Sequence, residues 1–204
     1  MYKRQKEIIA TLPIETFPGK IVVIDNERDA DNALLQLNNE RIIGFDTETR
    51  PTFKKGKSNH VALIQLSTHD TCYLFRINRI GFTPAIKNLL ENESLLKVGI
   101  SLKDDFCMLS RLNGGQFIPK NFIELQKFVK KYNIEDQSLQ KIYGIVIGKK
   151  ISKGQRLSNW EADHLTENQQ LYAATDAWSC IKIYEVLKSG KFKSPIYKIQ
   201  PSSL

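Results

Sequence analysis

The sequence contains few cysteines, and their spacing suits neither a zinc site nor a disulfide framework. Cys72, Cys107 and Cys180 lie far apart, and no Cys-x-x-Cys pair occurs. All three sit in apolar runs, so we expect them to be small core residues in a reducing compartment. The usual cysteine-dependent folds are therefore not expected for this chain.

Long hydrophobic runs are also missing from the sequence. No run approaches 18 consecutive apolar residues, which excludes a predicted membrane-spanning helix. The first ten residues carry basic side chains but no apolar stretch long enough for a signal peptide. Neither internal repeats nor low-complexity tracts are present. We therefore expect an intracellular protein, cytoplasmic if it is bacterial, with no membrane partner.

The chain does have an excess of positive charge. Its 204 residues include 30 Lys and Arg against 22 Asp and Glu, which gives a formal charge of +8. That length suits one domain with a substantial core. Small basic proteins commonly bind polyanions, and nucleic acid is the most common of these.

The order of the expected elements indicates an α/β fold. Strands are predicted at 21–24, 41–48, 61–66, 71–75 and 95–100, and helices near 26–37, 84–92, 103–112, 126–132, 138–147 and 166–188. Thr166 and Gln169 are spaced as a capping box at the start of the last helix. Residues 121–125 are compatible with either a last strand or a helix start. Residues 1–20, punctuated by prolines, are expected to form an N-terminal arm. Strands that precede helices favour a mixed β-sheet flanked by α-helices.

Two acids at the end of a buried strand are the most informative feature. Side chains alternate along a strand, so Asp46 and Glu48 should point to the same side while Thr47 points to the other. Neighbouring carboxylates in an apolar setting repel each other and lose hydration. A hard divalent cation would relieve that cost. The alternative is a solvated turn with two surface acids.

Two further acids lie on predicted helices. Asp105 borders an apolar stripe and is the inward candidate, whereas Asp104 should face solvent; Asp105 can also be read as a helix N-terminal carboxylate. Asp176 lies within an apolar seam of the last helix, with Tyr172 four residues earlier on the same face. A buried Asp176 needs a cation or strong donors. A buried arginine or a capping interaction would serve equally.

These residues resemble the motifs of the DEDD 3′–5′ exonucleases, in the subclass with tyrosine in the third motif. The three matching segments are Phe45-Asp-Thr-Glu-Thr49, residues 98–106 and Leu171-Tyr-Ala-Ala-Thr-Asp-Ala-Trp178. Residues 55–66 and Arg156-Leu-Ser-Asn-Trp160 are most similar to exonuclease domains of the Werner syndrome helicase type. Ribonuclease D and the proofreading domains of family A DNA polymerases resemble the chain more distantly.

The resemblance implies a ribonuclease H-like fold and catalysis with two metal ions. The exonuclease domain would span 21–190, followed by a C-terminal tail at 191–204. Two Mg²⁺ or Mn²⁺ ions would be held by Asp46, Glu48, Asp105 and Asp176, with Asp46 bridging both. Tyr172 would orient the attacking water or help to deprotonate it. The product would be a nucleoside 5′-monophosphate released from a 3′ end.

Substrate contacts are expected from several polar side chains and one backbone group. The resemblance implies that the Thr47 N–H binds the terminal 3′ oxygen. Two basic loops, Lys54–Lys57 and Lys149–Arg156, are candidates for phosphate contacts, although either can be a solvated loop. His60 could approach the scissile strand. The charged candidates are Lys55, Lys57, Lys153 and Arg156. The leading hypothesis is an exonuclease that acts on recessed or single-stranded DNA ends. The alternatives are an exoribonuclease of the ribonuclease D type and a catalytically inactive nucleic-acid-binding module.

Overall fold

A computed structural model of the chain describes residues 6–51, 60–190 and 192. The expected C-terminal tail therefore lies almost wholly outside the described residues, as do Lys55 and Lys57. The strands are β1 Lys20–Ile24, β2 Ile42–Thr49, β3 Val61–Ser67, β4 Thr71–Phe75, β5 Leu96–Gly99 and β6 Phe122–Glu124. The helices are α1 Lys6–Thr11, α2 Glu27–Leu37, α3 Ile77–Ile80, α4 Pro84–Leu90, α5 Leu102–Leu112, α6 Leu125–Phe128, η1 Val129–Tyr132, α7 Leu139–Ile147 and α8 Glu167–Lys188.

The strands form one mixed six-stranded sheet in the order β1-β4-β3-β2-β5-β6. Strand β3 pairs antiparallel with both β2 and β4, and β1 pairs parallel with β4. On the other side of β2, β5 pairs parallel with β2 and β6 pairs parallel with β5. Strand β2 thus lies inside the sheet, between the antiparallel and parallel parts. The expected α/β architecture is confirmed.

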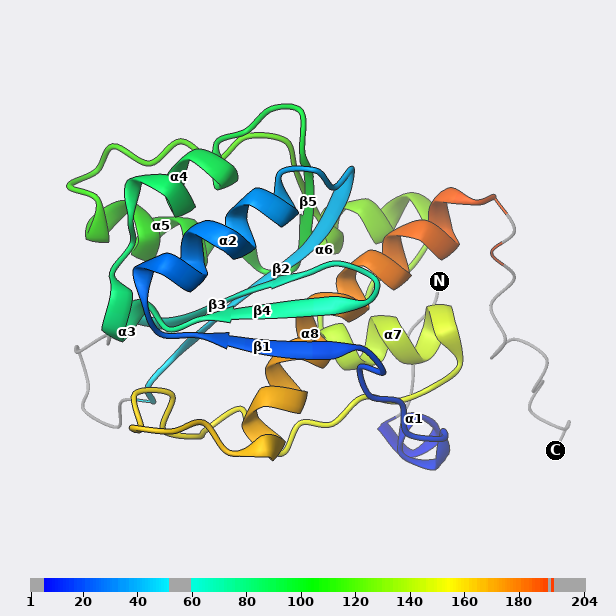
Figure 1. The fold of residues 1–204 in the computed structure, drawn as a ribbon. Helices are drawn as coiled ribbons and strands as arrows, with labels where there is room; N and C mark the ends of the chain where they lie inside the picture. The colour runs from blue at the N-terminus through cyan, green and yellow to red at the C-terminus, as the bar shows by residue number, and fades with distance from the viewer. Residues whose placement is uncertain (1–5, 52–59, 191, 193–204) are drawn as a thin grey trace, which may run out of the picture.

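Helices cover both faces of the sheet (Figure 1). One hydrophobic cluster joins α2, α4 and α5 to the sheet, and a second cluster joins α6, α7 and α8 to it. Helix α8 is buried along most of its length, in agreement with the apolar seam expected around Asp176. Side chains that leave β2 on opposite sides therefore enter two separately packed layers.

Local sequence signals explain where the helices begin. The Asn26 side chain accepts from the Asp29 N–H at 3.0 Å and starts α2. Thr83 precedes a proline in the first turn of α4. Thr166 and Gln169 form the expected capping box of α8. The uncertain segment 121–125 contains both alternatives, because strand β6 passes directly into helix α6.

Three features differ from the sequence expectations or add to them. The short helices α1 and α3 have no counterpart among the expected elements. The described part of the N-terminal segment packs against the domain, with Phe17 buried. The prediction that Cys107 is a core residue is wrong, because it is exposed, whereas Cys72 and Cys180 are buried. Helix α5 buries Leu102 and Leu109, and a helical turn of 100° per residue places Cys107 on the opposite side.

Candidate active site

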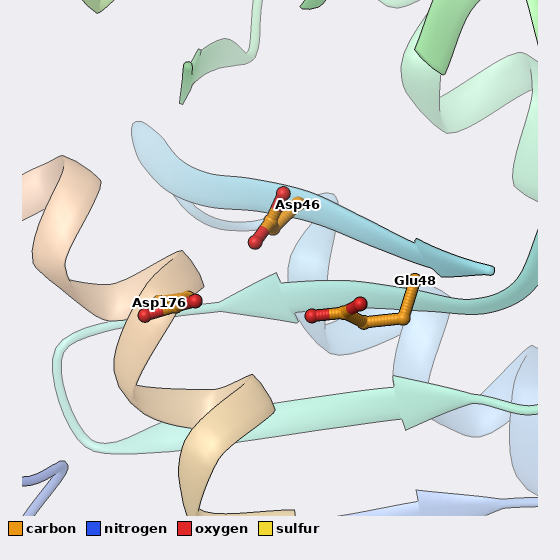
Figure 2. A group of neighbouring side chains, drawn as sticks. All are labelled: Asp46, Glu48 and Asp176. Carbon is orange, nitrogen blue, oxygen red and sulfur yellow. The ribbon is translucent and has the colours of Figure 1, made fainter. Parts of the chain in front are cut away.

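Three carboxylates meet where β2 ends beside α8 (Figure 2). Asp46 and Glu48 leave β2 on the same side, and Asp176 comes from α8, so that one oxygen from each lies within 4.8 Å of the others. Gly44 permits this approach, because a Cβ there would lie 1.9 Å from the Ala177 carbonyl oxygen. The strand and the helix therefore make backbone contact next to the acids.

The electrostatics of these acids reflect burial and mutual repulsion. Burial, and then the neighbouring carboxylates, raise the pKa of Asp46 well above its ordinary value. Burial and the charges of Asp176 and Asp105 raise the pKa of Glu48 to about 9, although Arg156 opposes this shift. Burial raises the pKa of Asp176 to about 7, against a hydrogen bond from Tyr172. The cluster therefore favours bound positive charge, either protons or a cation.

Asp105 reaches the site from the other face of the sheet. It is half-buried on α5, whereas the neighbouring Asp104 is exposed, as the helical phase predicts. The Thr47 hydroxyl donates to Asp105 Oδ1. Burial is the main cause that raises the pKa of Asp105 to about 6. Asp105 lies outside the group of three oxygens but raises the pKa of Asp46 through its charge.

Tyr172 is buried one helical turn before Asp176. Its ring centroid lies 6.1 Å from that of Trp160, which is itself fully buried in the loop before α8. Burial, followed by the charges of Asp176 and Glu48, raises the pKa of Tyr172. The phenol is therefore neutral near pH 7 and can donate or accept a hydrogen bond at the edge of the cluster.

A pocket of about 440 Å³ holds the four acids and Tyr172, together with Lys153 and Arg156. Two of the predicted basic contacts thus face the carboxylates, while Lys55 and Lys57 fall outside the described residues. His60 is exposed and is not among the described residues that line the pocket. The Thr47 N–H, expected to contact substrate, donates to Asp46 Oδ1 at 3.0 Å.

Several lining residues were not expected from the sequence. Gln137, Ser138 and Gln140 border the pocket from the start of α7. Glu124 accepts hydrogen bonds from the backbone N–H groups of Ser101 and Leu102, at 3.1 and 2.8 Å, and so caps α5 near Asp105. Polar residues in a loop carry no periodic signal, and only the folded chain brings them to the acids. The one sequence signal for Glu124 was the position of an acidic side chain directly before a predicted helix.

Comparison with known proteins gives a consistent family. The model of a family described as 3′–5′ exonuclease matches residues 21–190. The mouse (Mus musculus) bifunctional 3′–5′ exonuclease/ATP-dependent helicase WRN is 37% identical over 196 residues, which cover 90% of this chain. The chain spans only 14% of the length of that relative.

Solved structures share the fold at lower sequence identity. The Aedes aegypti Nibbler EXO domain superposes with a TM-score of 0.77 at 23% identity, covering 86% of this chain and 91% of that one. Escherichia coli RNase D, an exoribonuclease involved in structured RNA processing, gives a TM-score of 0.73 at 21% identity and covers 84% and 46%, respectively. The ribonuclease H-like arrangement expected from the motifs is confirmed.

Within the described part of the chain, no helix is long and apolar enough to cross a bilayer.

Proposed function

The chain belongs to the 3′–5′ exonuclease family, and from this premise we propose that it removes nucleotides from the 3′ end of DNA with two divalent metal ions, Mg²⁺ or Mn²⁺. The observation that carries this proposal is the approach of Asp46, Glu48 and Asp176 to within 4.8 Å in one pocket. Lys153 and Arg156 line the same pocket. Carboxylates opposite basic side chains suit a phosphodiester whose charge is shared between metal ions and cations.

The residues present fit such ions. All donors are carboxylate oxygens, which hard divalent cations prefer. Asp176 Oδ1 is buried and has no hydrogen-bond partner among the described residues, so its lone pairs are available. Asp46, Glu48 and Asp176 would hold one ion, and Asp46 with Asp105 would hold the other. Bound divalent ions would supply the Lewis acidity that activates a water and stabilises the leaving 3′ oxygen.

The protein groups would then position the substrate. We assign Tyr172 to orienting the attacking water, because its raised pKa keeps the phenol protonated near neutral pH, so that no phenolate is available as a base. Lys153 and Arg156 would bind the scissile or adjacent phosphate. The Thr47 N–H would serve the terminal 3′ oxygen only by exchanging its bond to Asp46. The product would carry a 5′-phosphate.

DNA is the proposed substrate on the balance of similarity. Identity is 37% to the mouse exonuclease/helicase and 21% to the Escherichia coli exoribonuclease. The second candidate is an exoribonuclease, which the structural likeness to RNase D favours. The choice depends on contacts to the 2′-hydroxyl position, which the carboxylates do not determine.

Matched single-stranded DNA and RNA oligomers of one sequence, labelled at the 5′ end, test the proposal. We expect stepwise shortening with Mg²⁺ or Mn²⁺, faster on DNA, and complete arrest by EDTA. Asp46→Asn and Asp176→Asn should each lower kcat roughly 1000-fold, because several kcal/mol of transition-state stabilisation is lost. Asp31→Asn, an exposed acid on α2, is the matched control.

Two outcomes would contradict parts of this assignment. Binding of oligomers without cleavage in either metal would remove the enzymatic function and leave the binding-module alternative. Faster shortening of RNA would reverse the substrate assignment. Release of nucleoside 3′-monophosphates would be incompatible with the proposed attack, because the cleaved bond would then be the wrong one.

A further inference from the structure

A second, larger groove adjoins the catalytic pocket. It has a volume of about 920 Å³ and runs over the start of α5 and the β6–α6 junction. Ser101, Asp104 and Gln137 line both hollows, so the groove opens directly into the pocket that holds the carboxylates. Lys130 and Gln137 also line a third hollow of about 690 Å³, beside η1. A continuous track therefore leads away from the acids.

Three exposed lysines line this track. Lys103 lies in the first turn of α5, and Lys127 and Lys130 are three residues apart on α6 and η1. Within the described ranges, none of these three ammonium groups has a carboxylate within ion-pair distance. Their positive charge is therefore available to a ligand rather than neutralised within the fold.

The two carboxylates that line the groove, Glu124 and Asp104, differ in how far they can neutralise the charge of the lysines. Glu124 is half-buried, and its carboxylate accepts from the N–H groups of Ser101, Leu102 and Gln126, at 3.1, 2.8 and 3.1 Å. Those bonds hold the Glu124 charge against the backbone and also fill the N-terminus of α5. Asp104 is exposed at the junction with the catalytic pocket. The positive charge is thus concentrated farther along the groove.

Aromatic rings form part of the groove wall. Phe106 and Phe122 are half-buried, and their ring centroids lie 4.8 Å apart in an edge-to-face contact. Asn121 and Gln126 add amide groups to the same lining. Positive side chains interleaved with aromatic surface are typical of grooves that bind unpaired nucleotides, because the cations bind the phosphates and the bases stack on the rings.

We propose that this groove, from Ser101 to Lys130, binds the single-stranded nucleotides immediately upstream of the 3′ end that is being cut. The proposal rests on the proposed exonuclease function, which places that 3′ end at the carboxylates. Lys103, Lys127 and Lys130 then contact successive phosphates of the retained strand. Because these contacts lie beyond the scissile bond, they strengthen binding of long substrates and leave the chemistry of the last phosphodiester unchanged.

The test uses the full chain with all three lysines changed, Lys103→Gln, Lys127→Gln and Lys130→Gln. Binding of a labelled DNA 15-mer is measured in EDTA between 50 and 300 mM salt, so that no cleavage occurs. The slope of log K against log salt should fall by about 2, at about 0.7 per lost phosphate contact. Affinity at 0.1 M salt should fall on the order of 10- to 100-fold.

Measurements of turnover distinguish a loss of binding in the groove from a defect at the catalytic centre. With Mg²⁺, the variant should show a raised KM on the 15-mer, an unchanged kcat, and unchanged kcat/KM on a dinucleotide. The control variant, Lys20→Gln with Arg28→Gln and Lys188→Gln, removes the same charge from exposed positions outside the groove. It should keep the wild-type salt slope within about 0.5.

Three results would overturn the proposal. An unchanged salt slope would show that the three lysines do not contact phosphates. An equal loss of slope in the control variant would show that the effect comes from net charge and not from the groove. Equal losses on the dinucleotide and the 15-mer would place the lysines in catalysis or folding instead. Failure of the exonuclease function is distinguishable, because a wild-type chain that cuts nothing still reports its salt slope in EDTA.

Discussion

Gly44 determines how closely α8 can approach β2. A Cβ at this residue would lie 1.9 Å from the Ala177 carbonyl oxygen and 2.7 Å from its carbon, and backbone atoms cannot rotate away. Asp46 is two residues further along the strand, and Asp176 directly precedes Ala177. The spacing of the three carboxylates therefore depends on a residue that carries no functional group.

Gly44→Ala should destabilise the fold and separate the carboxylates. Forcing α8 away from β2 is an overpacking defect, and we expect a loss of about 2–4 kcal/mol in the free energy of unfolding. Urea denaturation measures this loss. Gly154→Ala is the stability control, because its nearest neighbour would be the Ser152 Oγ at 3.4 Å, and it should change stability by less than about 0.5 kcal/mol. Equal values for the two variants would contradict the role of the contact.

Strand and helix positions followed from the sequence wherever local signals were strong. Alternation along β2 placed Asp46 and Glu48 on one side, and the capping box located the start of α8. Contacts between distant segments were not predictable in this way. Glu15 shows why, because its partners Tyr143, Lys149 and Lys182 lie more than 120 residues away in sequence. The exposed Cys107 was misjudged because an apolar run does not fix the face of a helix.

Glu15 joins the N-terminal segment to α7, the basic loop and α8. Lys149 Nζ donates to it at 2.7 Å and Lys182 Nζ at 2.9 Å. Its backbone N–H also donates to the Lys150 carbonyl, at 2.8 Å, in the loop that carries Lys153 and Arg156. Burial alone would raise the pKa of Glu15, but bonds from Lys149, Tyr143 and Lys182 outweigh it and lower the pKa to about 2.

Glu15→Gln should remove stability in a pH-dependent way. A carboxyl whose pKa is lower in the folded state stabilises that state above its ordinary pKa, and the benefit disappears as pH falls from about 4.5 to about 2. We expect a difference on the order of 2–3 kcal/mol from wild type at pH 7 that narrows steadily below pH 4. Urea denaturation at a series of pH values measures it. A difference that is independent of pH would assign the effect to packing.

The whole molecule carries a formal charge of +8, yet the described residues bring three carboxylates together where β2 ends beside α8. A basic surface attracts polyanions over distances comparable to the Debye length, which is about 10 Å at 0.1 M salt. The carboxylates would repel a bare phosphodiester at contact. Attraction of the nucleic acid to the basic surface and neutralisation of the carboxylates are therefore separate effects. Protons or metal ions bound to the cluster should change the free energy of unfolding of the protein.

The stability of the metal-free protein should decrease as pH rises. Burial and mutual repulsion raise the pKa values to about 6 for Asp105, about 7 for Asp176 and about 9 for Glu48. The folded state therefore retains protons that the unfolded chain has lost, and the benefit fades as pH rises from about 4 through about 9. Divalent ions replace those protons, so Mn²⁺ should raise Tm by several degrees at pH 8.5 and very little at pH 5.

Thermal unfolding in EDTA and in Mn²⁺ at both pH values measures this coupling. Glu48→Gln carries no titrating group at that position, so its metal-free Tm should change less with pH than that of wild type, and its response to Mn²⁺ should shrink. Asp31→Asn, which leaves the cluster intact, should match wild type in both respects. A Mn²⁺ response of the same size at pH 5 and pH 8.5 would mean that metal and protons do not compete for the carboxylates. The cluster would then be ionised in the metal-free fold, and the cation would stabilise it by charge alone.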